Sequence, residues 1–544
     1  MDLEFLDADA PAGCVVETST DDGVITWSVA NEGPAPVVVD RVLLRWRTTG
    51  RTPTRWFRNG WQSWSPSGGG PIPAEAPLRA RGSNRAGGAL LSPDRADPSD
   101  PRSELVTLVG DPDGAFCLGF DGGDRHDGRF RVRGAEIVAE AYLGGAVLGP
   151  GESRTLHAIQ IERGEPAELL QHWAAWAGQA SRARRDASHR VGWCSWYQYF
   201  GDVTEDVLRA NLADAGDWPI EVFQLDDGYQ TQIGDWLRCS DAFSSSLERI
   251  AADVASAGFV PGLWLAPFLV SPRSRVAADH PDWIVRTPAG TPVVGLVNAA
   301  WGGEQHVLDT THPDVLSHLE ALTHTLVGMG WRYLKLDFTY APALPGDARD
   351  PSRTPAERVR LGFDALRRGT GDEAFILGCG APLGPCIGVV DGMRIGPDIA
   401  PYWTPRRSVG GGGDDAPAIL NAWRNTLARS FMHRRLWLND PDCLVLRRRG
   451  TRLTGRQRLA WTHAVAASGG IVVLSDDLHQ LDPQAHDLLD EVLGISRAVD
   501  DASRSGVAPA CPDLLERWTP TTLEAGFISL VGDPTRGVAR LSTM

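Results

Sequence analysis

Over residues 1–160, hydrophobic and polar positions alternate in short runs that glycine and proline separate. The clearest examples are GVITWSVANEGPAPVVVDRVLLRW (23–46) and FRVRGAEIVAEAYLGGAVLGPGESRTLHAIQI (130–161). A period of two is typical of strands that bury one face. Many short strands joined by Gly/Pro turns predict an antiparallel β-sandwich.

The pattern changes after a helical stretch, PAELLQHWAAWAGQASRARRD (166–186). Short apolar segments then alternate with amphipathic helical ones. Eight segments have the composition of buried strands: 190–200, 220–230, 260–269, 331–340, 374–382, 392–398, 435–443 and 471–478. Eight strand–helix units predict a (β/α)8 TIM barrel. The alternative, an open doubly wound sheet, usually carries a glycine fingerprint for a nucleotide, and this chain has none.

The pattern predicts three domains. Residues 1–180 form the sandwich with a linker helix, and residues 181–491 form the catalytic barrel. Residues 492–544 form a short C-terminal β region with strand-like pieces FISLVG and GVARLS.

Composition narrows the functional classes. The formal net charge of −16 argues against a nucleic-acid or anionic-membrane binder. No apolar run is long enough for a membrane span, and the acidic N-terminus lacks the features of a signal peptide. The eight cysteines are scattered without CxxC pairs, so we expect reduced thiols in a cytoplasmic protein. We expect no metal and no cofactor.

Polar residues follow most of the predicted strands. The strand ends read CSWY, LDDGY, WLAPF, KLDF, GCG, RIGPD, NDPD and SDD. In a barrel these carboxyl ends share one face, which holds the active site. Packing alone does not explain polar groups that converge from so many strands.

Lys335 is the only lysine among 53 basic residues. In the strand YLKLDF, alternation places Lys335 and Asp337 on one side and Leu334, Leu336 and Phe338 on the other. An ammonium group beside Asp337 favours the ionised carboxylate, which is a candidate nucleophile.

Two aspartates in VVDGMRIGPD are candidates for a proton-carrying partner. Asp391 precedes the strand and should lie at the bottom of the barrel, where structural roles dominate. Asp398 follows the strand and should lie on the catalytic face. Two carboxylates on one rim are the arrangement that cleaves glycosidic bonds with retention.

The motifs WCSWYQYF, FQLDDGYQ, GLWLAPF, YLKLDF, ILGCGAPLGP, DGMRIGPD, FMHRRLWLNDPDCL and SDDL, with NGWQSWS at 59–65, resemble glycoside hydrolase family 36, the α-galactosidases (melibiases). The resemblance implies retaining hydrolysis of terminal α-D-galactosyl residues of small oligosaccharides, with Asp337 as nucleophile and Asp398 as acid/base. It implies a galactose pocket formed by Trp64, Tyr197, Asp226, Asp227, Trp264, Lys335, Cys379 and Arg394. It also implies a C-terminal β-domain, for which the roughly 50 residues that remain would make a small or incomplete version.

Several alternatives stay open. Within the family these are an α-N-acetylgalactosaminidase and an α-galactosyl transferase. Outside it they are a Schiff-base aldolase that uses Lys335 and a noncatalytic carbohydrate-binding protein. Asp226 and Asp227 are adjacent, so both can reach one ligand only if their strand has already ended in a turn. The oligomeric state, including a homo-oligomer, is left open.

Overall fold

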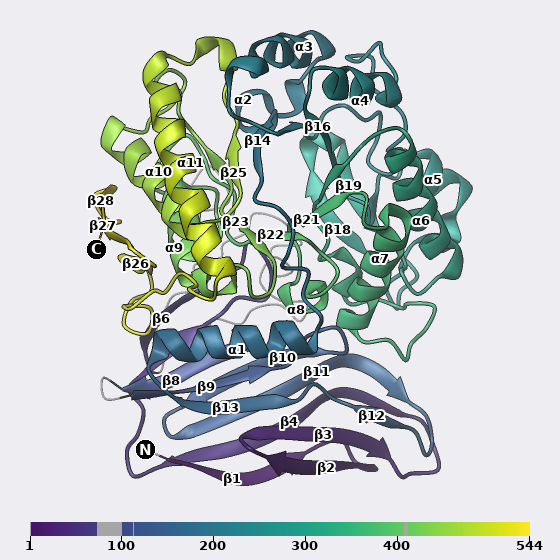
Figure 1. The fold of residues 1–544 in the computed structure, drawn as a ribbon. Helices are drawn as coiled ribbons and strands as arrows, with labels where there is room; N and C mark the ends of the chain where they lie inside the picture. Colours follow the sequence, from purple (N-terminus) through teal and green to yellow (C-terminus); the bar gives the residue numbers. More distant parts are fainter. Residues whose placement is uncertain (1, 73–100, 112–113, 407–411, 544) are drawn as a thin grey trace.

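The computed structural model describes residues 2–72, 101–111, 114–406 and 412–543. Along the chain it places two antiparallel sheets, a parallel barrel surrounded by helices, and a small antiparallel sheet beside the barrel (Figure 1). The fold class predicted from the sequence pattern is confirmed.

The N-terminal sandwich consists of two sheets. One has the order β1 (Asp2–Asp9), β4 (Val37–Thr49), β11 (Glu136–Leu148), β10 (Asp127–Arg133) and β7 (Ser103–Glu104). The other has the order β12 (Ser153–Thr155), β3 (Val24–Asn31), β13 (Ile159–Gly164), β9 (Gly114–Phe120), β8 (Val106–Asp111), β5 (Arg55–Arg58) and β6 (Gly68–Pro71), with β2 (Cys14–Asp21) paired to β3. The alternation has the expected consequence on β4, where Val42, Leu44 and Trp46 are buried between more exposed arginines.

Helix α1 (Pro166–Ala180) lies across the sandwich, between it and the barrel (Figure 1). Its Trp173 is buried and donates an indole hydrogen bond of 3.0 Å to the carbonyl oxygen of Phe120 in β9. The same ring packs edge-on against Phe431 of the barrel, with centroids 6.1 Å apart. One tryptophan therefore joins the two domains.

The barrel sheet has the order β23 (Leu438–Asp440), β22 (Gly392–Arg394), β21 (Phe375–Gly378), β20 (Tyr333–Leu336), β16 (Val260–Leu265), β15 (Val222–Leu225), β14 (Val191–Cys194), β25 (Val472–Leu474) and β24 (Cys443–Leu444). Neighbouring strands are parallel. Only Pro441 and Asp442 separate β23 from β24, so the two ends of the sheet meet and the barrel closes. These two short strands occupy the seventh position of eight.

The break in that seventh strand has a local cause. Pro441 has no backbone N–H to donate to a neighbouring strand, and Asp442 adopts a left-handed conformation with φ of 85°. The chain therefore turns at Asp442, and the aspartate is directed toward the carboxyl end of the barrel.

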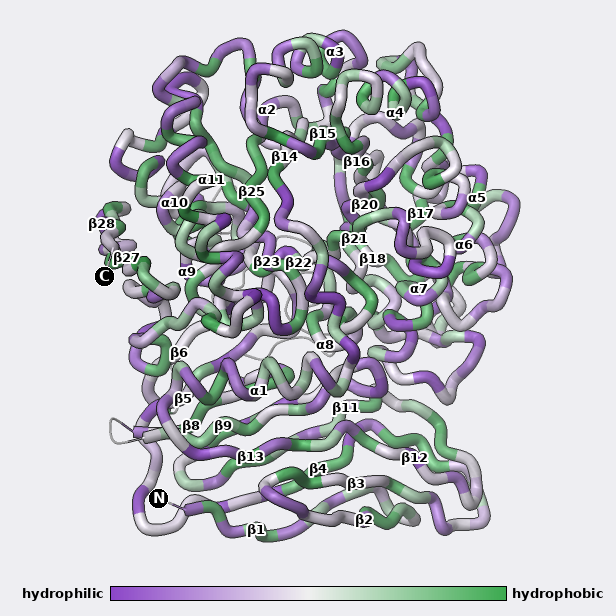
Figure 2. Tube along the Cα trace, viewed as in Figure 1, coloured by the Kyte–Doolittle hydropathy of each residue, from purple (hydrophilic) through white to green (hydrophobic). Residues whose placement is uncertain are grey.

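Helices surround the barrel in Figure 1. The longer ones are α3 (Glu205–Asp214), α4 (Leu247–Ser256), α6 (Pro313–Gly328), α7 (Pro355–Thr370), α9 (Ile419–Ala428), α10 (Gly455–Ser468) and α11 (Pro483–Arg504). The shorter ones are α2 (Trp196–Tyr199), α5 (Arg275–Asp279) and α8 (Leu383–Cys386). Hydrophobic residues are concentrated along inner strands such as β15 and β25, whereas hydrophilic residues are frequent on the outer loops (Figure 2).

Two further sheets complete the described chain. Strands β17 (Leu269–Val270), β18 (Val294–Asn298) and β19 (Gly303–Val307) form an excursion between β16 and β20. Strands β26 (Thr522–Ala525), β27 (Ile528–Asp533) and β28 (Val538–Thr543) form the C-terminal antiparallel sheet. Residue 491 lies inside α11, and the division into domains at 180 and 491 stays a prediction.

Candidate active site

A cavity of about 200 Å³ opens at the carboxyl ends of the barrel strands. Its walls contain seven of the residues singled out from the sequence: Trp64, Asp226, Asp227, Trp264, Lys335, Asp337 and Asp398. Tyr197, Cys379 and Arg394 are buried and do not line this cavity. The remaining lining residues are Trp196, Leu296, Asn298, Trp301, Phe338, Asp415 and Pro417.

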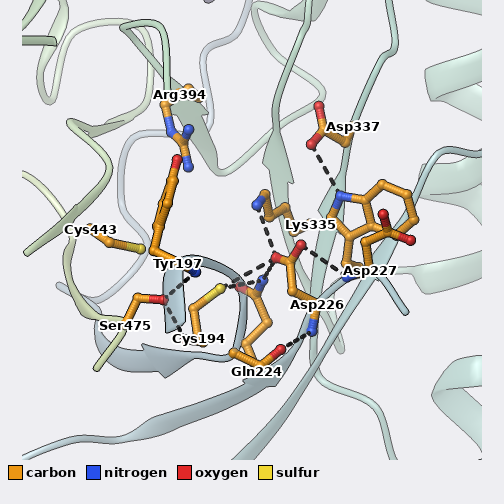
Figure 3. A network of polar contacts seen from close by, with 12 residues as sticks. Cys194, Tyr197, Gln224, Asp226, Asp227, Lys335, Asp337, Arg394, Cys443 and Ser475 are labelled. Carbon is orange, nitrogen blue, oxygen red and sulfur yellow. Dashed lines mark hydrogen bonds and ion pairs between the residues drawn. The ribbon is translucent and has the colours of Figure 1, made fainter. Parts of the chain in front are cut away.

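Lys335 lies on β20 and forms an ion pair with Asp226, its Nζ 2.9 Å from Oδ2 (Figure 3). Both side chains are buried. The same carboxylate oxygen accepts hydrogen bonds from Gln224 Nε2 at 2.6 Å and from Cys194 Sγ at 3.3 Å. Burial alone lowers the pKa of the Lys335 ammonium, but the adjacent Asp226 more than offsets this and holds the pKa above its ordinary value. The lysine is therefore charged and fixed in direction.

Both adjacent aspartates reach the cavity because β15 ends at Leu225 and the chain turns at once. Asp227 accepts the indole N–H of Trp301 at 2.8 Å and the side-chain amide of Gln230 at 2.6 Å. Burial raises the pKa of Asp227 to about 6. The turn that the sequence analysis required for both residues to reach one ligand is present.

Asp337 follows the last residue of β20 and shares the cavity with Lys335, as alternation predicted. Its Oδ2 accepts the indole N–H of Trp264 at 3.0 Å, and its Oδ1 accepts the backbone N–H of Phe338 at 2.7 Å. Two donors thus fix the plane of this carboxylate. Trp264 on β16 is the register partner of Lys335 on the neighbouring strand β20.

The prediction for Phe338 was wrong. Alternation placed its side chain on the far side from Asp337, yet it lines the cavity. Strand β20 ends at Leu336, and Phe338 has a left-handed backbone with φ of 52°. The period of two no longer applies beyond the end of the strand.

Asp398 lies in the loop after β22, with its side chain 36% exposed. Arg394 Nη1 donates to Asp398 Oδ1 at 3.1 Å. Partial burial of Asp398 raises the pKa of its carboxyl, Arg394 lowers it, and the negative charge of Asp337 raises it further. Asp398 therefore holds its proton to a higher pH than an ordinary aspartate, which suits a proton donor.

Arg394 is held by two more carboxylates. Its Nε donates to Asp440 Oδ2 at 3.0 Å, and its Nη2 lies 2.8 Å from Asp442 Oδ1. Asp442 also accepts the hydroxyl of Tyr197 and the backbone N–H of Ile399. In Figure 3 the Tyr197 hydroxyl points toward the Arg394 guanidinium. The NDPD motif thus fixes both the arginine and the backbone beside Asp398.

Trp64 comes from the sandwich and reaches the cavity, packing edge-on against Phe338 with centroids 5.1 Å apart. Its loop is attached to the barrel by Arg429, which is fully buried. This guanidinium donates to the Asn59 side chain and to the carbonyl oxygens of Gly60, Gln62, Ser63, Ser65 and Ile395, at 2.8–3.1 Å. The placement of Trp64 therefore depends on an arginine 365 positions away in sequence.

Asp391 lies at the opposite end of β22 and is absent from the cavity wall. It pairs with Arg184 at 2.7 Å and Arg367 at 2.6 Å, and accepts the backbone N–H of Ile376. These contacts match the structural role expected for an aspartate at the bottom of the barrel. Among the described residues, no group of three or more His, Cys, Asp or Glu side chains is arranged to hold a metal ion.

Five lining residues had no signal in the sequence analysis: Leu296, Asn298, Trp301, Asp415 and Pro417. Asn298 and Trp301 belong to the β18–β19 excursion, which has no counterpart in the eight strand–helix units. Asp415 lies in the loop between β22 and α9, in a glycine-rich segment with no periodicity. Trp196, by contrast, stood inside the quoted motif WCSWYQYF.

The burial of Asp415 leads to a prediction about how the stability of the protein depends on pH. Its side chain is buried, and among the described residues its Oδ1 has no hydrogen-bond partner. Burial raises the pKa of Asp415 to about 6. An acid with a raised folded-state pKa destabilises the protein when it ionises, so the cost is absent near pH 4 and complete above pH 6. Asp415→Asn should therefore raise the free energy of unfolding at pH 7.5, by at most about 3 kcal/mol, and change it little at pH 4. Denaturant titrations at the two pH values test this, and an equal gain at both would contradict it.

Comparisons with known proteins agree with the geometry of the site. The Melibiase family model matches residues 179–358. The α-galactosidase AgaA of Geobacillus stearothermophilus is 28% identical over 195 residues, which are 34% of this chain and 26% of AgaA. The crystal structure of AgaA, a GH36 α-galactosidase, superposes on this chain with a TM-score of 0.61. The superposition includes 97% of this chain and 78% of AgaA, and at 15% sequence identity it shows the fold alone. TtGalA, the α-galactosidase from Thermus thermophilus in complex with stachyose, has a TM-score of 0.71 and 29% identity over 88% of this chain and 99% of its own. This chain is a relative of the family 36 α-galactosidases.

The resemblance predicted from the motifs is thereby confirmed. The Melibiase match includes Asp226, Asp227, Trp264, Lys335 and Asp337, whereas Asp398 lies outside it. The alignment with curated AgaA spans about a quarter of that protein's length.

Proposed function

We propose that this protein is a retaining glycoside hydrolase that removes terminal α-D-galactosyl residues from small oligosaccharides. The observation that carries the proposal is one small cavity walled by Asp337 and Asp398 together with tryptophans and an ordered Lys335–Asp226 pair. Relatives with this fold are α-galactosidases, and one was solved with stachyose and with p-nitrophenyl α-D-galactopyranoside.

The first chemical step uses the two aspartates in different protonation states. Asp398, whose pKa is raised, donates its proton to the glycosidic oxygen as the bond to the anomeric carbon breaks. The Asp337 carboxylate attacks that carbon from the opposite face and forms a galactosyl ester. The hydrogen bonds from Trp264 and from the backbone of Phe338 aim the carboxylate before substrate arrives.

The second step reverses the roles. Asp398, now ionised, takes a proton from water as the water oxygen attacks the anomeric carbon. The ester bond to Asp337 breaks, and α-galactose leaves with its original configuration. Arg394 remains close to Asp398 in both states because Asp440 and Asp442 hold its other nitrogens.

The remaining wall residues are suited to bind sugar hydroxyls. Asp226 and Asp227 supply acceptors and Lys335 supplies donors, while the buried indole N–H of Trp64 has no partner among the described residues. The tryptophan rings supply apolar faces that pack on pyranose rings. We place Tyr197, Cys379 and Arg394 behind these groups as part of the same galactose pocket.

The ion pair disfavours the aldolase alternative. A Schiff base forms from a neutral amine, whereas Asp226 holds the pKa of Lys335 above its ordinary value. No observation favours the α-N-acetylgalactosaminidase or transferase alternatives over α-galactosidase.

We also propose a cytoplasmic location, because all eight cysteines are free thiols, as is typical of reducing compartments. No helix in the described ranges has the length and apolar character to cross a membrane. Homo-oligomerisation stays a prediction.

The mechanism predicts the configuration of the first product. Proton NMR during hydrolysis of p-nitrophenyl α-galactoside should show α-galactose appearing first, with β-galactose following only by mutarotation. An initial β-anomer would exclude Asp337 as a nucleophile, because inversion requires a direct attack by water. No release of p-nitrophenol at all would reject the proposed function.

A further inference from the structure

The proposed reaction leaves one charged group in the cavity wall without a role. Asp415 lines the cavity and is 9% exposed. Among the described residues, its Oδ1 accepts no hydrogen bond. Its neighbour Asp414 is different, because that carboxylate is paired with Arg424 at 3.3 Å and is absent from the cavity wall.

The fold fixes the position of Asp415. Asn421 of α9 donates its side-chain amide to the carbonyl oxygens of Gly413 and Ala416, at 3.0 and 2.8 Å. Arg424, one turn further along α9, holds both the side chain and the carbonyl oxygen of Asp414. The loop is therefore attached on both sides of Asp415, and its carboxylate, with Oδ1 free of partners among the described residues, is held at the cavity by the helix.

A buried carboxylate oxygen without a donor is costly, so the presence of Asp415 Oδ1 at a ligand cavity requires an explanation. Arg424 is close enough to compensate it but is occupied by Asp414. A ligand that brings hydroxyl donors would supply the missing hydrogen bonds. Charge-assisted bonds of this kind are stronger than neutral ones.

The connection of this loop to Asp398 shows which part of the ligand is involved. The backbone N–H of Ala418 donates to the carbonyl oxygen of Asp398 at 3.0 Å, so the end of the loop that carries Asp415 and Pro417 is tied to the proton donor. A proton donor lies beside the oxygen of the departing group, because that is the atom it protonates. The leaving group therefore lies on the side of the cavity where Asp415 is located.

We propose that Asp415 is a specificity-determining residue that accepts a hydrogen bond from a hydroxyl of the leaving group, and that it selects sugar leaving groups over aryl ones. This inference rests on the proposed α-galactosidase activity. It adds that the natural substrate carries a polyhydroxylated leaving group, such as a hexose, directly after the galactosyl unit.

The test compares two substrates that share the galactosyl unit. Melibiose has glucose as its leaving group, and p-nitrophenyl α-galactoside has an aromatic ring without hydroxyls. For Asp415→Ala, the ratio of kcat/KM for melibiose to kcat/KM for the aryl substrate should fall at least tenfold. Asp415→Asn keeps the shape and loses the charge, so its ratio should fall by a smaller factor in the same direction.

Asp414→Glu is the matched control, because it changes the adjacent side chain while keeping a carboxylate for Arg424, and its ratio should equal that of the wild type. An unchanged ratio in Asp415→Ala, or an equal loss on both substrates, would overturn the inference. If the alanine variant fails to fold, the asparagine variant decides by the same ratio. A wild-type enzyme inactive on both substrates would instead refute the proposed function, which separates the two failures.

Discussion

Replacing Asp398 with alanine should lower kcat/KM for raffinose by at least about 1,000-fold, within the range that general acid–base catalysis contributes. A sugar leaving group needs a proton as it departs, and the variant has none to give. The aryl substrate p-nitrophenyl α-galactoside should lose far less, because its leaving group is stable as an anion. The galactosyl ester on Asp337 should then accumulate, since no base activates water.

Azide provides the decisive readout for this variant. It is a small anionic nucleophile that needs no base, so it should restore turnover of the aryl substrate by attacking the galactosyl ester from the side that water uses, and yield α-galactosyl azide. The fold should remain intact, because Arg394 keeps its contacts with Asp440 and Asp442 when the bond to Asp398 is lost. Near-normal activity on raffinose would show that another group is the acid.

The pH dependence of kcat/KM in the wild type and in Asp398→Ala provides a second test of Asp398 as the acid. In the wild type, kcat/KM for raffinose should fall as pH rises through the pKa of Asp398, because only the protonated acid can donate. Since enclosure in the cavity and the charge of Asp337 raise that pKa, this decline lies above the usual range of aspartate. Asp398→Ala should lack the decline when assayed on the aryl substrate.

The strand pattern was sufficient to predict where Asp337, Lys335 and Asp398 come together. Apolar runs that end in polar residues identify the carboxyl ends of the strands, and a barrel brings those ends to one face. Alternation then selected the correct side for Lys335 and Asp337. It failed at Phe338, two residues past the end of β20, where a left-handed backbone turned the ring into the cavity.

Long-range contacts could not be derived from the sequence in this way. Trp301 reaches Asp227 from 74 positions away, and Arg429, at the end of α9, holds the carbonyl oxygen of Ser63 in the Trp64 loop from 366 positions away. Neither contact follows from a local period, because each depends on how separate elements pack. Trp64 and the pocket role of Arg394 were expected from family resemblance. Asp415 had neither a motif nor a period to mark it, and it became visible only because its buried Oδ1 has no hydrogen-bond partner among the described residues.

Lys335 is the position where the choice between lysine and arginine can be tested. Every other basic residue is arginine, so a general requirement for positive charge would be met by arginine here as well. The structure gives a more specific reason for lysine. Its ammonium is 2.9 Å from Asp226, in a space shared with the side chains of Gln224 and Cys194, and the lysine is only 6% exposed. A planar guanidinium is wider than an ammonium and carries its donors in a fixed plane.

We therefore expect Lys335→Arg to fold and to lose at least about 100-fold in kcat/KM on p-nitrophenyl α-galactoside, which equals roughly 2.7 kcal/mol of transition-state stabilisation. Lys335→Met should be no more active, because it removes the donors and leaves Asp226 without its buried counter-charge. Circular dichroism and thermal melts of both variants control for folding. An arginine variant within a few-fold of the wild type would show that the compact ammonium is not required, and that Asp226 tolerates either cation. A loss confined to KM would place Lys335 in ground-state binding of the sugar, whereas a loss in kcat would show that its hydrogen bonds strengthen as the galactosyl ring approaches Asp337.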